Sequence, residues 1–279
     1  MTVNTQLEYH ERDRLVEKAI AFLRTLNGEM YRGVQKALYV QAADVLTEGD
    51  LPVGEFDRIY FGVEFCERRI PSVHQLEKAI SICREDGKPL TLVTPIVTDW
   101  GLKRLNPLFG RLMEYDEHAE VVVNEYGTLM FLREKFPSFK VVMGRVLIRQ
   151  KKDPRVPLIH DEKIRGYFSG SVLDSAYFCK FLHGQNTRRV ELDNLPHAQP
   201  PQADFSVSLY YPFVFITTSR NCVAETCDEC ARVHYMLYHP TMGDGLIFYG
   251  RSQFFVNLNL NWLENSRIDR IVYQFYVPL

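Results

Sequence analysis

Three cysteines, Cys222, Cys227 and Cys230, lie within nine residues and are the strongest chemical signal in this chain of 279 residues. Thiolates this close in sequence can converge on one metal ion or cluster, whereas a disulfide framework would spread its cysteines more widely. The start of the chain is polar and shows no export signal, so we expect a cytoplasmic protein with reduced cysteines. The triplet is therefore predicted to bind a metal.

A fourth thiolate, Cys66, follows directly on an apolar run over 57–65 and precedes the charged residues Glu67, Arg68 and Arg69. Cys66 and the triplet together would complete the ligand set of an iron-sulfur cluster. The spacing of four and two residues within the triplet also occurs in plant-type [2Fe-2S] ferredoxins, although no cysteine follows Cys230. We expect [4Fe-4S] ahead of [2Fe-2S], with a structural four-cysteine zinc site as the alternative.

Short apolar runs rich in β-branched residues alternate with amphipathic stretches along the chain, which is typical of parallel strands joined by helices. The predicted strands cover 36–42, 57–65, 89–97, 119–124, 140–148, 188–194, 204–211 and 269–277. The predicted helices cover 72–86, 100–113, 126–136 and 171–183. This pattern predicts an α/β fold: one (β/α)8 TIM-barrel-like domain over 1–279, with a helical extension over 1–35 and an extra β-hairpin over 245–258.

The helix over 72–86 has the clearest boundaries. Ser72 is placed to cap it, Gln75 occupies the capping-box position, and Gly87 follows its last turn. Cys83 falls on its apolar stripe and is expected in the core, and Cys179 is assigned to another helix face in the same way.

Polar residues at the ends of the predicted strands are the candidates for substrate binding, because the active site of a (β/α)8 barrel lies at the C-terminal ends of its strands. Arginines there could hold a carboxylate through paired hydrogen bonds, and the competing interpretation is a solvated loop or core packing. The candidates are Glu64, Arg68, Arg69, Asn124, Arg145, Glu191 and Tyr210.

Composition excludes several classes of protein. With 33 basic and 35 acidic residues, the net charge of −2 argues against broad nucleic-acid binding, although a local basic site leaves RNA open as a substrate. No apolar run is long enough to cross a membrane, so no membrane insertion is expected. The sequence lacks HExxH, GxSxG, P-loop and GxGxxG motifs.

Several segments resemble the collagenase-like peptidase U32 family, in particular its UbiU/UbiV branch. They are YFGVEFCERR (60–69), VVVNEYGTL (121–129), RRVELDN (188–194) and YYPFVFITTSRNC (210–222). The resemblance implies a [4Fe-4S] protein that takes part in oxygen-independent hydroxylation of a quinone precursor, as in ubiquinone biosynthesis, or of an RNA base, with prephenate as oxygen donor. It also implies a heterodimer with a second protein of the family and a small carboxylate as substrate.

The triplet departs from the UbiV-like pattern, which has a longer gap before the final cysteine pair and three residues within it. Two other functions stay open beside the hydroxylation system. One is a non-catalytic partner or binding protein stabilised by a cluster or by zinc. The other is an unconventional peptidase.

Overall fold

The main body of the protein is a closed barrel of eight parallel strands in the order β1-β12-β7-β6-β5-β4-β3-β2. This computed structural model describes residues 21, 33–46, 53–153, 155–198, 204–219, 222, 234–239, 243–260 and 268–274. The barrel strands are β1 (Gln35–Val40), β2 (Arg58–Gly62), β3 (Leu90–Val93), β4 (Glu120–Val123), β5 (Lys140–Met143), β6 (Arg189–Asp193), β7 (Ser206–Tyr211) and β12 (Ile268–Gln274). The predicted (β/α)8 fold is confirmed, and each predicted strand contributes one barrel strand.

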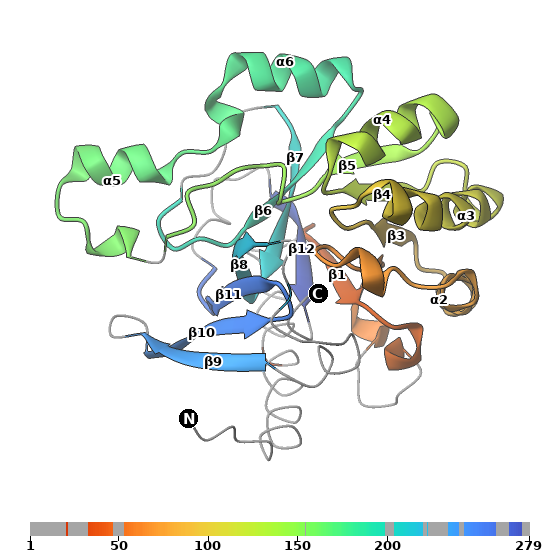
Figure 1. The fold of residues 1–279 in the computed structure, drawn as a ribbon, viewed down its shortest axis with the longest axis horizontal. Coiled ribbons are helices and arrows are strands. Elements are labelled where there is room, and N and C mark those ends of the chain that lie inside the picture. The colour runs from red at the N-terminus through yellow and green to blue at the C-terminus, as the bar shows by residue number, and fades with distance from the viewer. Residues whose placement is uncertain are drawn as a thin grey trace.

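Helices surround the barrel (Figure 1). They are α2 (Val73–Glu85), α3 (Asp99–Tyr115), α4 (Tyr126–Lys135), α5 (Glu162–Ser169) and α6 (Ala176–Gly184). Short 3-10 turns are η2 (Ala43–Leu46), η3 (Val53–Glu55), η4 (Glu67–Arg69), η5 (Val156–Leu158) and η6 (Val172–Asp174). Figure 1 shows α5 projecting away from the barrel, whereas α2, α3 and α4 lie along one side of it.

Local sequence accounts for the helix boundaries. Ser72 and Gln75 form the predicted capping box of α2, and Gly87 follows that helix with a φ of 64°. Cys83 is fully buried in the core, as predicted. The helix predicted over 171–183 is divided into η6 and α6, because the Ser175 hydroxyl accepts from the backbone N–H of Phe178 and starts a new helix.

A second sheet is antiparallel and has the order β8-β11-β10-β9. Its strands are β8 (Phe213–Thr218), β9 (His234–His239), β10 (Gly243–Tyr249) and β11 (Ser252–Val256). The predicted hairpin is confirmed as β10 and β11, but it belongs to this larger sheet, whose other two strands the sequence analysis did not predict. Because β8 follows β7 after the single residue Pro212, the second sheet starts at the C-terminal end of the barrel.

Most of the predicted N-terminal extension lies outside the described residues. Within the part of the chain that is described, no helix is long and apolar enough to cross a membrane.

Candidate functional site at the C-terminal end of the barrel

Arg145 lies at the centre of a buried polar cluster at the C-terminal end of the barrel. Its Nε and Nη2 donate to the two carboxylate oxygens of Glu64 at 3.0 and 2.7 Å. Its Nη1 donates to Asp193 Oδ1 at 2.8 Å and to the carbonyl oxygen of Phe213 at 2.9 Å. With its amide oriented to satisfy both neighbours, Gln274 accepts from Nη2 at 2.7 Å and donates to the same Phe213 carbonyl. All five N–H groups of the guanidinium therefore have acceptors.

The charges in this cluster are balanced. Asp193 also accepts from Lys152 Nζ and, at 2.8 Å, from the backbone N–H of Phe215. Two carboxylates therefore face two cations, and the side chains of Arg145, Glu64 and Asp193 are fully buried. Burial alone would lower the pKa of Arg145, but the two carboxylates raise it above its ordinary value, so the guanidinium stays charged.

The same arginine connects two segments that carry predicted metal ligands. Glu64 is two residues before Cys66, and Phe213 begins β8, which leads toward Cys222. A second contact brings these segments together, because the ring of Phe65 stacks on Phe215 with centroids 4.6 Å apart. The first cysteine segment and the strand before the triplet therefore pack directly against each other.

Arg251 also contacts both segments, the one before Cys66 and the one before Cys222. Its Nη1 donates to the Phe65 carbonyl at 3.4 Å, and its own carbonyl accepts from the backbone N–H of Ser219 at 2.9 Å. Ser219 is three residues before Cys222, which is exposed, whereas Cys66 is buried. Cys227 and Cys230 lie outside the described residues, and within those residues no three His, Cys, Asp or Glu side chains are grouped to hold a metal.

A second polar group lies inside the barrel beside the Arg145 cluster. Tyr210 donates from its hydroxyl to Glu191 Oε2 at 2.7 Å, and its ring faces the Arg145 guanidinium at 4.1 Å. Glu191 Oε1 and the hydroxyl of Tyr39 are buried and have no hydrogen-bond partner among the described residues. Burial raises the pKa of Glu191 to about 8, so its carboxyl group carries a proton at neutral pH.

Comparison with known proteins gives a likeness of fold alone. No family model matches the chain, and no curated protein matches it. A solved structure titled "The Structure of the U32 Peptidase Mk0906" is similar over 86% of this chain and 92% of that chain, with a TM-score of 0.46 and 10% sequence identity.

Six of the seven predicted substrate-binding residues fall into two groups in the structure. Glu64, Arg145, Glu191 and Tyr210 come together at the C-terminal end of the barrel, where all four are buried. Arg68 and Arg69 lie in η4, directly after Cys66; Arg68 is exposed and Arg69 is half-buried. The second group is therefore the one that solvent reaches.

Asn124 holds the neighbouring loops together. Its Nδ2 donates to the Thr94 carbonyl at 3.0 Å, and its Oδ1 accepts from the backbone N–H of Val146 at 3.3 Å. A Cβ atom on Gly144 would lie only 2.1 Å from that Oδ1, so the loop before Arg145 requires glycine there. Asn124 thus fixes the path of the segment that carries Arg145.

Three residues of the cluster are missing from the predicted candidates. Asp193 ends the same predicted strand as Glu191 but was not retained, and Lys152 and Gln274 were not considered. Asp193 and Gln274 are the last residues of β6 and β12, so their strand-end positions were an available signal. Lys152 lies in an irregular segment after β5, where neither position nor periodicity marks it.

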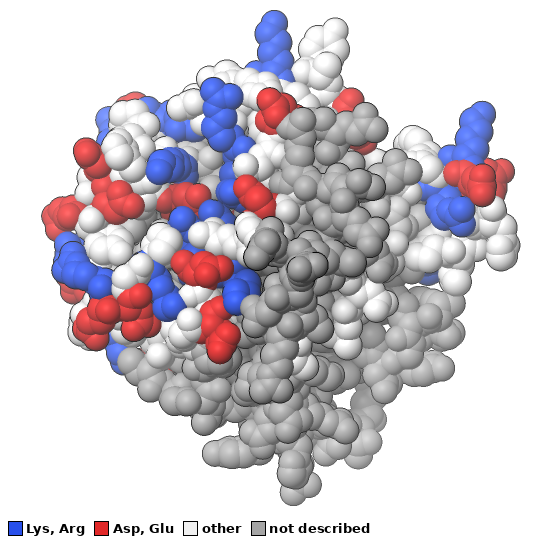
Figure 2. Space-filling model, turned by 180° about the vertical axis from the view of Figure 1, so that it is seen from behind, with Lys and Arg blue, Asp and Glu red and all other residues white. Residues whose placement is uncertain are grey.

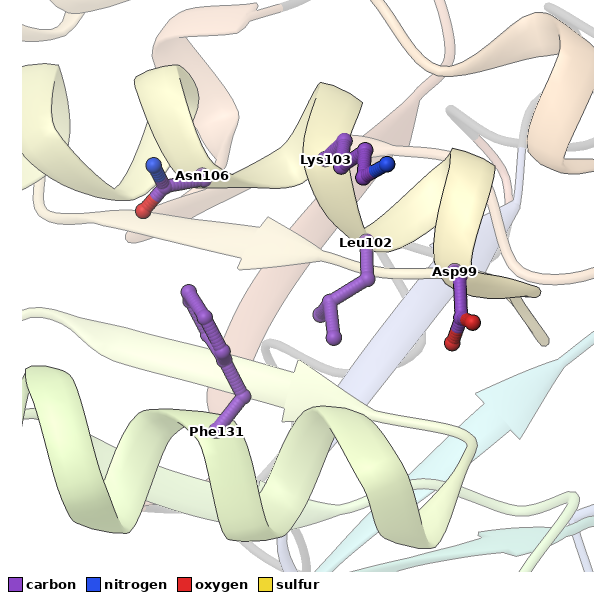
Figure 3. Close-up of a pocket in the computed structure, with 5 residues that line it drawn as sticks. All are labelled: Asp99, Leu102, Lys103, Asn106 and Phe131. Carbon is purple, nitrogen blue, oxygen red and sulfur yellow. The ribbon is translucent and has the colours of Figure 1, made fainter.

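A groove of about 360 Å³ lies on the outside of the barrel between α3 and α4. Figure 3 shows Leu102 from α3 and Phe131 from α4 facing this space, with Asp99, Lys103 and Asn106 along the α3 side. None of the predicted ligands or substrate-binding residues lines it. The groove is therefore separate from the candidate site.

Proposed function

We propose that this protein is an iron-sulfur protein of the U32 peptidase-like type, close to the UbiU/UbiV branch, that takes part in oxygen-independent hydroxylation. The observation that carries the proposal is the set of contacts made by Arg145. One buried guanidinium binds Glu64, two residues before Cys66, and the Phe213 carbonyl at the start of the strand that leads toward Cys222. Cysteines from distant parts of the chain can meet only if their segments are held together in this way.

The donor set fits a cluster. Cys66, Cys222, Cys227 and Cys230 would provide four thiolates, and a buried position such as that of Cys66 shields a ligand from solvent. When bound, such a cluster supplies one-electron transfer. Glu64 and Asp193 do not add uncompensated negative charge to this end of the barrel, because Arg145 and Lys152 neutralise them.

Arg68 and Arg69 are the proposed binding residues for a small carboxylate such as prephenate. They follow Cys66 directly, and neither is buried. Arg145 is less suited to this role in the described arrangement, because Glu64 and Asp193 already occupy its donors. On the face of the molecule that Figure 2 shows, basic and acidic side chains are intermixed over the described part, without the basic surface that RNA binding requires.

Metal analysis after anaerobic purification tests the cluster. We expect a brown protein with broad visible absorbance and with bound iron and acid-labile sulfide, and the Fe:S stoichiometry with electron paramagnetic resonance distinguishes [4Fe-4S] from [2Fe-2S]. Cys66→Ala should lose iron. Cys179→Ala is the matched control, because this α6 cysteine donates to the Leu173 carbonyl and is not a predicted ligand. A colourless protein with one zinc per chain, or full iron content in Cys66→Ala, would contradict the assignment.

A non-catalytic partner is the second candidate function, and one observation favours it. Phe65, Phe213, Phe215, Ile247 and Phe254 form a buried apolar cluster beside the Arg145 network. These residues cover the end of the barrel where a catalytic site would open to substrate. Calorimetric titration of the iron-loaded protein with prephenate separates the two candidates: saturable binding that Arg69→Gln weakens supports a catalytic component, and no heat of binding supports a partner.

A further inference from the structure

A second charged layer lies at the N-terminal end of the barrel, opposite the cysteine segments. Arg270 on β12 reaches across the barrel to β4, where its Nη1 and Nη2 donate to the two carboxylate oxygens of Glu120 at 2.6 and 3.1 Å. Arg189 on β6 makes a similar pair with Asp269, at 2.5 and 2.9 Å. Each of these two arginines therefore has a carboxylate of its own.

The third arginine of this layer, Arg58 on β2, has no carboxylate of its own. Its Nε donates to Gln35 Oε1 at 3.3 Å and its Nη1 to Thr91 Oγ1 at 3.0 Å, and both acceptors are neutral. The nearest carboxylate oxygen, Glu120 Oε2, is 3.4 Å from Nη1 and already accepts from Arg270. Among the described residues, Arg58 Nη2 makes no hydrogen bond, and three guanidinium groups share two carboxylates.

The surplus positive charge is largely removed from water, because the side chain of Arg58 is only 13% exposed. Burial lowers the pKa of Arg58, and the neighbouring Arg270 and Arg189 lower it further against the opposing effect of Glu120. A charge in such surroundings is costly unless a counterion accompanies it. The layer still reaches solvent, since the side chains of Arg58, Glu120 and Arg189 keep 13 to 15% exposure.

We infer that the N-terminal opening of the barrel binds one small oxyanion, held by the free Nη2 group of Arg58 within this positively charged layer. The two N–H groups of Nη2 are charged donors, and hydrogen bonds from a guanidinium group to phosphate or carboxylate oxygens are stronger than those between neutral groups. Asp269 is 45% exposed and remains paired with Arg189, so the anion adds to the existing ion pairs and displaces neither. This site lies at the other end of the barrel from Cys66 and does not depend on the proposed cluster.

Thermal unfolding of the full chain with inorganic phosphate tests the site, with sodium chloride at the same ionic strength as reference. At about ten times its Kd, phosphate should raise the Tm of the wild-type protein by roughly 2 to 3 °C, in a saturable manner. Acetate in a parallel series distinguishes a carboxylate ligand from phosphate. A Tm rise no larger than that given by chloride, for both anions, would overturn the proposal.

Variants locate the binding. Arg58→Gln should abolish the anion-dependent rise without lowering the Tm in chloride, because it removes the uncompensated charge. Arg58→Lys keeps the charge but not the planar guanidinium group that places Nη2, and should weaken phosphate binding several-fold as judged by ³¹P line broadening. Arg165→Gln on the projecting helix α5 is the matched control and should respond as wild type. An unchanged phosphate response in both Arg58 variants would refute this location.

Discussion

Replacing Glu191 by glutamine should make the protein more stable at pH 8 and leave its stability nearly unchanged at pH 4. Glutamine keeps the oxygen that accepts from the Tyr210 hydroxyl and resembles a protonated carboxyl group in shape. The wild-type carboxyl group is fully buried, and burial raises its pKa from 4.5 to about 8. Folding therefore requires Glu191 to retain a proton that the unfolded chain releases.

The sign and size of the effect follow from proton linkage. Below pH 4.5, Glu191 is protonated in both states and the carboxyl group adds no penalty. Between pH 4.5 and 8 only the unfolded chain loses the proton, so the wild-type free energy of unfolding falls by about 1.4 kcal/mol per pH unit through this group. The penalty reaches at most about 5 kcal/mol near pH 8 and is constant above that.

Urea unfolding of both proteins at half-unit steps from pH 4 to pH 9 measures the difference in free energy of unfolding. Because every other titrating group is common to the two proteins, the difference isolates Glu191. Glu162→Gln is the control, since its side chain on α5 is 90% exposed, and its difference should stay flat with pH. A Glu191→Gln difference that is also flat across this range would refute the buried, protonated carboxyl group.

Two further predictions concern the path of the chain around the site. Arg145→Met should cost about 3–5 kcal/mol in urea unfolding and also lower bound iron, because it leaves the buried Glu64 carboxylate without a cation, leaves Asp193 with Lys152 alone and releases both cysteine segments. Equal stability of this variant and wild type would refute that reasoning. Gly62→Ala should lower the Tm more than Gly144→Ala, because an added Cβ at Gly62 meets the Val93 backbone at 2.2 Å with a φ of 131°, whereas at Gly144 the nearest obstacle is a side chain. A larger fall in Tm for Gly144→Ala than for Gly62→Ala would contradict this prediction.

Much of the barrel follows from local sequence. The eight apolar runs identify the strands because parallel strands are covered on both faces, and the residues around Ser72 define α2 through its capping box. The second sheet was harder to predict. Strand β8 follows β7 after Pro212 alone, so a single proline within a largely apolar segment is the local signal that the chain leaves the barrel.

The composition of the site could be predicted only in part. Alternation along β5 places Val142 in the barrel interior, and continuing it would direct Gly144 inward and Arg145 outward. The chain instead turns at Gly144, whose N–H donates to the Val123 carbonyl and whose carbonyl accepts from Leu147, and this turn brings Arg145 into the cluster. The direction of a side chain beyond the end of a strand thus depends on the geometry of the loop, which the alternation of residues along the strand does not predict.

The interior of this barrel has an unusual distribution of charge, and that distribution bears on the candidate site. Barrels of this class are commonly filled by branched apolar side chains, but here charged layers lie at both ends, with valines and tyrosines between them. In the Arg145 cluster the donors and the charges already have partners. Such a cluster resists rearrangement, because moving one member leaves a buried charge unpaired. The segments before Cys66 and Cys222 are therefore held in fixed relation before any metal binds, which is what a cluster with ligands from two distant segments requires.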